Sequence, residues 1–185
     1  MNEAALRERL PVGVVHSRLS LARNRPSAVL VALEPERGVW LTRRSGMMPN
    51  HAGQVSLPGG KVEPGDASVE AAALREAQEE IGLDPACVEI LGRLDDYITG
   101  TGFHIAPVVA LVPRGVELHV ASAEVEEIFC LPFADLMDPE LPRARLTHLH
   151  GADRVFYVWP HEHHVIWGAT AEILRTLAIK LRGVA

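Results

Sequence analysis

The chain places three carboxylates, Glu76, Glu79 and Glu80, at positions i, i+3 and i+4 within residues 75–83 (REAQEEIGL). Positions three and four apart share one face of an α-helix, where these carboxylates would repel one another. A hard cation relieves such repulsion, because Mg²⁺ takes oxygen ligands and commonly bridges to the phosphates of a substrate. The pattern therefore predicts a metal-dependent site that acts on phosphates. A solvated acidic helix face is the alternative interpretation.

The helix that positions these carboxylates is expected to begin near Asp66 or Ser68, either of which can cap it, and to end at about Ile81. A glycine follows, which suits the left-handed residue after a helix. Leu74, Ala77 and Ile81 fall on one face at about 100° per residue. The three carboxylates are expected on roughly the opposite face, so that the helix has a core side and a carboxylate side.

Alternating runs of apolar residues and turn residues predict the other elements. Pro107 indicates an edge position or a bulge in its strand, because proline cannot donate to a sheet ladder. The mixture of strands with two substantial helices indicates a layered α/β or α+β domain. Strands are expected at 28–33, 39–42, 54–57, 88–94, 103–112, 118–120, 128–131 and 155–159, short helices at 4–10 and 134–137, and a closing helix at 169–181.

Composition narrows the class of protein. The 185 residues are 48% hydrophobic and 23% charged, as in an ordinary globular domain, and we expect a single domain over 1–185. A net charge of -6 without a basic run argues against a nucleic-acid surface. The apolar runs are far too short to span a bilayer, and the first ten residues lack the apolar core of a signal peptide. With only two cysteines, a cytoplasmic protein with reduced thiols is expected.

Residues 60–83 resemble the signature of the Nudix hydrolases, a glycine followed by a glutamate and then by R-E-U-x-E-E-x-G-U, in which U is bulky and apolar. The matching residues are Gly60, Arg75, Glu76, Glu79, Glu80, Gly82 and Leu83. Asp66 stands roughly where the signature has its first glutamate, and the spacing from Gly60 to Arg75 is one residue longer than usual. The resemblance implies an α/β/α sandwich with a mixed β-sheet and a motif spanning about 59–83.

The longer spacing is similar to one branch of the family, the coenzyme A pyrophosphatases. Upstream, the branch pattern is matched by Thr42, Arg44, Ser45, Gly53, Pro58, Gly59 and Gly60. The segments 97–109 (YITGTGFHIAPVV) and 166–171 (IWGATA) also resemble that branch. Two residues depart from it, since Pro49 stands where the branch has an arginine and Leu57 where it has a phenylalanine.

The resemblance implies a pyrophosphatase that cleaves the diphosphate bridge of coenzyme A or its derivatives, with Mg²⁺ or Mn²⁺ as cofactor. The products would be 3′,5′-ADP and 4′-phosphopantetheine or its acylated form. Hydrolysis of another nucleoside diphosphate derivative, such as ADP-ribose or NADH, is the alternative, and a Nudix module that senses a nucleotide without cleaving it is a further one. The partner would be a small molecule rather than a nucleic acid or a membrane. The oligomeric state stays open, with a homodimer as one option.

Residue roles follow from the same resemblance. Glu76 and Glu80 would be the first metal ligands, with Glu79 as a third ligand or the general base and the Gly60 carbonyl as a further ligand. Arg75 would orient one of these carboxylates. Glu124, ahead of Glu127, would be a loop carboxylate that acts as base or extra ligand. The substrate-binding candidates are Arg43, Arg44, Ser45, Gly59, Thr101 and Phe103.

Several of these residues also have a purely structural interpretation. For Arg43 and Arg44, a solvated strand end is as well supported by the sequence as substrate contact. Thr99, Thr101 and Phe103 could equally be part of an exposed strand. Trp167 is expected to pack at the start of the last helix rather than to stack on a base. His161, His163 and His164 are expected in an exposed polar loop rather than in a metal site.

Overall fold

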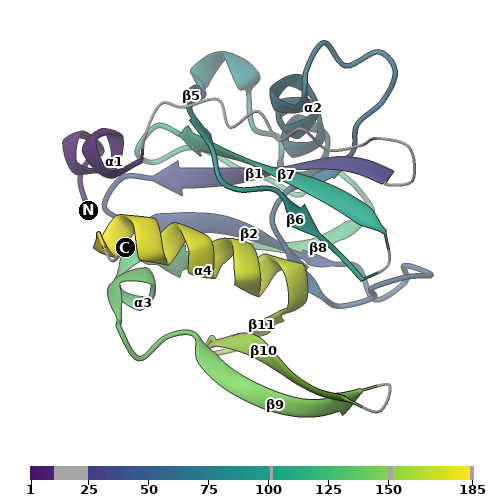
Figure 1. The fold of residues 1–185 in the computed structure, drawn as a ribbon. Coiled ribbons are helices and arrows are strands. Elements are labelled where there is room, and N and C mark those ends of the chain that lie inside the picture. Colours follow the sequence, from purple (N-terminus) through teal and green to yellow (C-terminus); the bar gives the residue numbers. More distant parts are fainter. Residues whose placement is uncertain (11–24, 101, 150–151, 184–185) are drawn as a thin grey trace.

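The computed structural model describes residues 1–10, 25–100, 102–149 and 152–183 and forms a mixed sheet between two long helices (Figure 1). The described elements, in chain order, are α1 (Glu3–Arg9), β1 (Arg25–Glu34), β2 (Gly38–Arg44), β3 (Val55–Ser56), β4 (Gly59–Lys61), α2 (Val69–Ile81), the short 3₁₀ helix η1 (Pro85–Cys87), β5 (Glu89–Arg93), β6 (Tyr97–Ile98), β7 (Phe103–Leu111), β8 (Val125–Pro132), α3 (Phe133–Met137), β9 (Arg143–Leu149), β10 (Ala152–Pro160), β11 (Val165–Trp167) and α4 (Gly168–Arg182).

Strand β1 carries the core on both of its faces. Val31 and Leu33 belong to the buried cluster that includes the inner side of α4, whereas Leu30 and Ala32 belong to the cluster that includes α2. Successive side chains of a strand point to opposite faces, so a continuous apolar run can bury both. The two helices therefore cover opposite faces of one sheet, as Figure 1 shows, and the expected α/β/α sandwich is confirmed.

The main sheet is mixed, because β1 runs parallel to β7 and antiparallel to its other partners. Its strand order is β3-β2-β1-β7-β5, with β4 on β1, β6 on β7 and β8 on β2. Gly60 of β4 lies opposite Ala28 of β1. This register places the turn at 58–60 beside the first half of β1, on the side where α2 packs.

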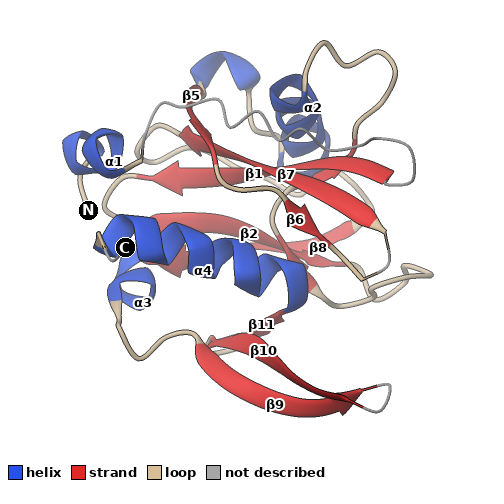
Figure 2. Cartoon of the chain, in the orientation of Figure 1, coloured by secondary structure: helices blue, strands red, loops and turns tan. Residues whose placement is uncertain are grey.

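A second, three-stranded sheet follows in the order β11-β10-β9 (Figure 2). Trp159 of β10 and Ile166 of β11 are fully buried, and the Trp159 indole donates to the carbonyl of Ala171 in α4. Beyond this anchor the β9–β10 hairpin projects away from the sandwich. No described helix is long and apolar enough to cross a membrane.

Two of the expected strand features are wrong. Residues 118–120 form no strand. The backbone in this region instead pairs with the end of α2. The N–H of His119 donates to the carbonyl of Ile81, and the N–H of Ala121 donates to the carbonyl of Glu80. Strand β7, which contains Pro107, lies between β1 and β5 rather than at an edge, and the irregularity lies in β5, between Ile90 and Gly92. The sequence patterns did not predict the short strands β4, β6 and β11 or the seven-residue strand β9.

Candidate active site

Helix α2 forms one wall of the site. Its start is capped by Ser68, whose hydroxyl accepts from the N–H of Ala71, and it ends at Gly82 in the left-handed conformation (φ 66°). Its packed side is made almost entirely of small residues and Ile81, which lets the helix lie close to the sheet. Glu80 is buried on this helix as well, with 6% exposure, so the expectation that all three carboxylates face away from the core is wrong for Glu80.

The Gly59–Gly60 turn is held against α2 by two of these carboxylates. The backbone N–H of Gly59 donates to Glu80 Oε2 at 3.1 Å. A Cβ on Gly60 would come within 2.5 Å of the Glu76 carboxylate, so only a glycine lets that side chain lie directly over the turn. Gly59 has φ +153°, and a Cβ there would meet the carbonyl oxygen of Ala28 at 2.4 Å. Backbone and carboxylates therefore approach each other closely at this point.

Arg75 joins the acidic groups around the turn. Its guanidinium donates to both oxygens of Asp66 at 3.0 and 3.1 Å, and its Nη1 donates to Glu76 and Glu79 at 3.1 and 3.2 Å. It also donates to the carbonyl of Lys61. Asp66, which stands roughly where the signature has its first glutamate, is thus tied to the carboxylate helix, and Arg75 contacts three carboxylates at once.

The electrostatics of α2 favour a cation. Burial raises the pKa of Glu80 to about 7, although the Gly59 N–H and the charge of Arg44 oppose this rise. Burial also raises the pKa of Glu76, against the pull of Arg75. Across the described part of the chain, no three carboxylate, imidazole or thiol groups converge closely enough to hold a metal by themselves. Glu76 and Glu80 fit a metal that completes its shell with backbone oxygen, water and substrate, as Mg²⁺ commonly does.

The two loop carboxylates have different surroundings. Glu124 is half exposed, pairs with Arg44 at 3.1 Å, and its charge contributes to the raised pKa of Glu80. Glu127 instead pairs with Arg43 at 3.2 Å and with His164 at 3.2 Å. Of these two glutamates, Glu124 is the one whose negative charge raises the pKa of Glu80.

A cavity of about 520 Å³ opens beside the turn and is lined by both glycines, Arg44, Lys61, Phe103 and Trp167, among others. The Nε atom of Arg44 is buried and has no hydrogen-bond partner among the described residues. Leaving a buried donor unpaired is costly, and because this nitrogen is shielded from the cavity, Arg44 acts on a ligand through its charge rather than through Nε. The cavity thus combines cationic donors with aromatic walls next to the buried carboxylates.

The motif and the fold place the chain among known proteins. A family model described as the NUDIX domain matches residues 23–164. The chain belongs to the Nudix family. A protein of Klebsiella pneumoniae (strain 342) named "Uncharacterized Nudix hydrolase NudL" is 40% identical over 177 residues, which cover 89% of this chain and 92% of that protein.

Solved Nudix structures are similar in fold. A crystal structure of an Ap4A hydrolase binary complex from C. elegans matches with a TM-score of 0.51 at 20% identity, over 60% of this chain and 83% of that one. The MutT Nudix hydrolase of Burkholderia pseudomallei matches with a TM-score of 0.50 at 24% identity, over 83% and 98%. These likenesses confirm the predicted Nudix fold and carry nothing about the substrate. The expectation of a Nudix hydrolase is confirmed at the level of the family.

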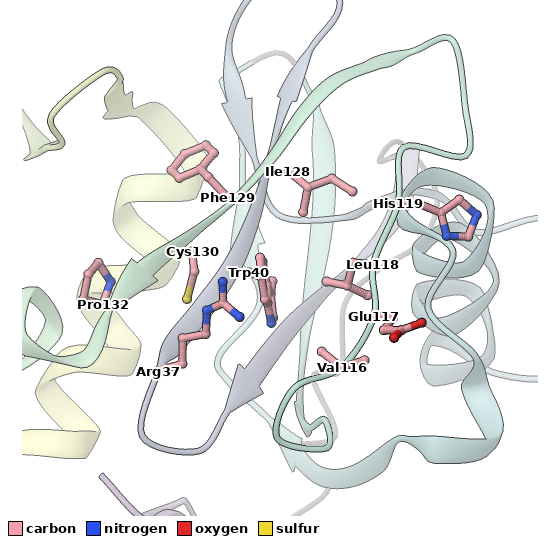
Figure 3. A pocket seen from close by; sticks show the side chains of 10 residues that line it. All are labelled: Arg37, Trp40, Val116, Glu117, Leu118, His119, Ile128, Phe129, Cys130 and Pro132. Atoms are coloured by element: carbon pink, nitrogen blue, oxygen red, sulfur yellow. The ribbon is translucent and has the colours of Figure 1, made fainter.

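A larger cavity of about 870 Å³ lies elsewhere in this Nudix domain, between β2, β8 and residues 116–119 (Figure 3). Trp40 and Cys130 line its floor and His119 its rim, and none of its lining residues was predicted as a site residue. Burial raises the pKa of the Cys130 thiol to about 12, so this thiol stays neutral and is not a nucleophile. The cavity has none of the carboxylates of the motif.

The structure brings some of the predicted site residues together and leaves others apart. Arg75, Glu76, Glu79 and Glu80 assemble around Gly59 and Gly60, and Arg44 and Phe103 line the adjoining cavity. Arg43 and Ser45 do not line it, because Arg43 pairs with Glu126 and Glu127 while the Ser45 N–H donates to the carbonyl of Glu124. Thr101 lies outside the described residues.

Trp167 departs from its expected packing role. It is 48% exposed and lines the cavity. Thr170, which the site prediction missed, lines the cavity too and bonds through its hydroxyl to the carbonyl of Val55. Both residues lie in the segment 166–171, whose resemblance to the coenzyme A branch is the sequence signal for them.

Proposed function

We propose that the chain is a metal-dependent pyrophosphatase that hydrolyses the diphosphate bridge of coenzyme A or its derivatives. The observation that carries this proposal is the convergence of three separate segments on one cavity. The turn at 58–60, residues 97–109 and residues 166–171 each resemble the coenzyme A branch, and all three contribute residues to the cavity of about 520 Å³. Segments far apart in the chain that share a pattern and a cavity are expected to share a ligand.

In this proposal Glu76 and Glu80 are the metal ligands next to the Gly59–Gly60 turn. Glu80 forms no ion pair within the described residues, and burial raises its pKa, so a bound cation would favour its charged form. Glu79, whose side chain is 58% exposed and is paired with Arg75 at 3.2 Å, would provide a third coordination position, and the Gly60 carbonyl another oxygen. A bound Mg²⁺ or Mn²⁺ would polarise the bridge oxygens and lower the pKa of the attacking water.

The residues of the chain then supply orientation and charge. Arg75 keeps Glu76 and Glu79 in place and does not itself reach the reacting atoms. Arg44 lines the cavity and supplies a positive charge for the phosphates of the substrate. Glu124 is assigned as the loop base that accepts the proton of the attacking water, because it is exposed and lies within the field of Glu80.

A hydrolysis panel tests the proposal. Coenzyme A, an acyl-coenzyme A, ADP-ribose and NADH are offered separately with Mg²⁺ and again with Mn²⁺, and the products are separated. The expected result is release of 3′,5′-ADP from coenzyme A with the highest kcat/KM of the panel. A clear preference for ADP-ribose or NADH would remove coenzyme A and leave a pyrophosphatase. Binding without turnover of any of the four would instead favour a sensing module.

The variant Glu80→Gln tests the site within the same panel. Loss of one metal ligand is expected to lower kcat by two or more orders of magnitude, since metal-assisted phosphoryl transfer depends on charge neutralisation. Glu70→Gln is the matched control, because it makes the same substitution in the first turn of the same helix, away from the turn at 58–60. Normal turnover in Glu80→Gln would show that the metal site is placed wrongly.

A further inference from the structure

One face of the β9–β10 hairpin carries three arginines, on the same side of the small sheet as Trp167. Arg143 lies opposite Val158, and Val158 lies opposite Trp167 of β11. Directly opposed residues of antiparallel strands point to the same face, so Arg143, Val158 and Trp167 share one surface. The same register places Arg145 opposite Phe156 and Arg154 opposite Thr147. With the period of two along each strand, all three arginines lie on this surface.

Trp167 connects this surface to the catalytic cavity. It lines the cavity of about 520 Å³ beside the Gly59–Gly60 turn. It also lines a neighbouring cavity of about 610 Å³, together with Val165 on the same face of β11. Trp167 therefore borders both cavities, as Gln54 and Val55 also do. A ligand that extends from the turn past Trp167 would continue onto the face that carries the arginines.

The three arginines have no carboxylate partner among the described residues. All three are exposed, and none forms an ion pair with a described residue. Arg43, Arg44 and Arg75, in contrast, each pair with carboxylates. In a chain of net charge -6, three free guanidinium groups on one strand pair make a local positive surface that attracts anions.

The spacing suits a nucleotide. Neighbouring strands lie about 4.8 Å apart, so the backbone of Arg143 is about 10 Å from that of Trp167, and Arg145 is about 7 Å further along β9. Phe156 and Val158 are half-buried and form an apolar strip on the same face between the arginines and Trp167. A guanidinium fork binds a terminal phosphate through two parallel hydrogen bonds.

We propose that Arg143, Arg145 and Arg154 form a specificity site that binds a phosphomonoester on the nucleotide half of the diphosphate substrate. The inference rests on the proposed pyrophosphatase function. In coenzyme A the group that fits is the 3′-phosphate, which lies on the ribose beyond the diphosphate bridge. Arg143 is the first contact, because it alone of the three lies in the same cross-strand row as Trp167.

The test compares coenzyme A with 3′-dephospho-coenzyme A, which has the same diphosphate bridge and lacks only the phosphomonoester. The wild-type protein is expected to favour coenzyme A in kcat/KM. Arg143→Gln is expected to lower kcat/KM for coenzyme A about ten-fold or more, through KM, because a charge-assisted bond to a phosphate is lost. The same variant should leave 3′-dephospho-coenzyme A unchanged, and Arg143→Lys should keep part of the preference.

The controls separate the two hypotheses. Arg114→Gln removes one charge from an exposed arginine that pairs with Glu36, far along the chain from the hairpin, and should change neither substrate. If wild type cleaves both substrates equally and the hairpin variants do nothing, the specificity site is refuted and the pyrophosphatase proposal stands. If Arg143→Gln slows both substrates alike, the site does not read the phosphomonoester and is also refuted. If wild type cleaves neither substrate, the proposed function fails and the inference fails with it.

Discussion

The Glu80 carboxylate accepts a hydrogen bond of 3.1 Å from the backbone N–H of Gly59. This bond joins the end of α2 to the turn that begins β4, 21 residues earlier in the chain. It keeps a carboxylate buried at the edge of a cavity, where desolvation disfavours its charge. The same contact that fixes the geometry of the site therefore leaves it with an unbalanced negative charge, which a divalent cation would balance.

The first prediction concerns the stability of the metal-free protein. The pKa of Glu80 is raised from 4.5 to about 7 on folding, so the folded state holds this proton more tightly than the unfolded state. Below about pH 4.5 the group is neutral in both states and has no effect. As the pH rises from 4.5 to 7, the free energy of unfolding should fall by about 3 kcal/mol, and it should then stay level.

Urea unfolding with a chelator, at several pH values between 5 and 8, measures this effect. Glu80→Gln keeps an acceptor for the Gly59 N–H and cannot ionise, so its free energy of unfolding should decline less than that of the wild type, with only the smaller contribution of Glu76 left. Glu70→Gln should follow the wild type. Added Mg²⁺ should stabilise the wild type more at pH 8 than at pH 5. Parallel pH curves for wild type and Glu80→Gln would contradict the prediction.

A second prediction is that substituting Gly60 lowers turnover while leaving the stability of the fold nearly unchanged. Gly60→Ala places a methyl group within 2.5 Å of the Glu76 carboxylate, at a backbone conformation that alanine tolerates. The side chain of Glu76 must move, so turnover is expected to fall at least ten-fold while the melting temperature changes by only a few degrees. Gly65→Ala is the control, because nothing lies within 4 Å of its Cβ. Equal activity of the two variants would show that Glu76 need not lie against the turn.

A third prediction concerns the two-oxygen contact between Asp66 and Arg75. The Arg75 guanidinium holds the pKa of Asp66 below its usual value, which shows that the pair is charged and oriented. In Asp66→Asn, Arg75 keeps Glu76, Glu79 and the carbonyl of Lys61 but loses the charged, two-oxygen contact that directs its guanidinium. We expect kcat to fall about ten-fold and the metal concentration for half-maximal activity to rise. Asp95→Asn, at an exposed position, should change neither quantity, and an unaltered metal requirement in Asp66→Asn would argue against the positioning role.

The sequence predicted the parts of this protein that depend on local periodicity. Helix α2 and its cap appear where the spacing placed them, because Ser68, the apolar face and Gly82 act within a few residues of each other. The burial of Glu80 could not be foreseen, since it depends on a backbone donor 21 residues away. Strands β9 and β11 were not predicted from the sequence for a similar reason. Exposed arginines and a three-residue strand have no apolar alternation, and pairing with β10 determines their conformation.

The last prediction decides between the two loop glutamates. Glu124 is exposed and interacts with Glu80 through its charge, whereas Glu127 is held by Arg43 and His164. Glu124→Gln should therefore lower kcat by about 10²–10⁴-fold, as expected for loss of a general base. Glu127→Gln should retain most of the turnover and lower the stability, because it deprives both Arg43 and His164 of a partner. Measuring kcat and the melting temperature for both variants distinguishes these roles. A larger loss of turnover in Glu127→Gln than in Glu124→Gln, at an unchanged melting temperature, would reverse the assignment.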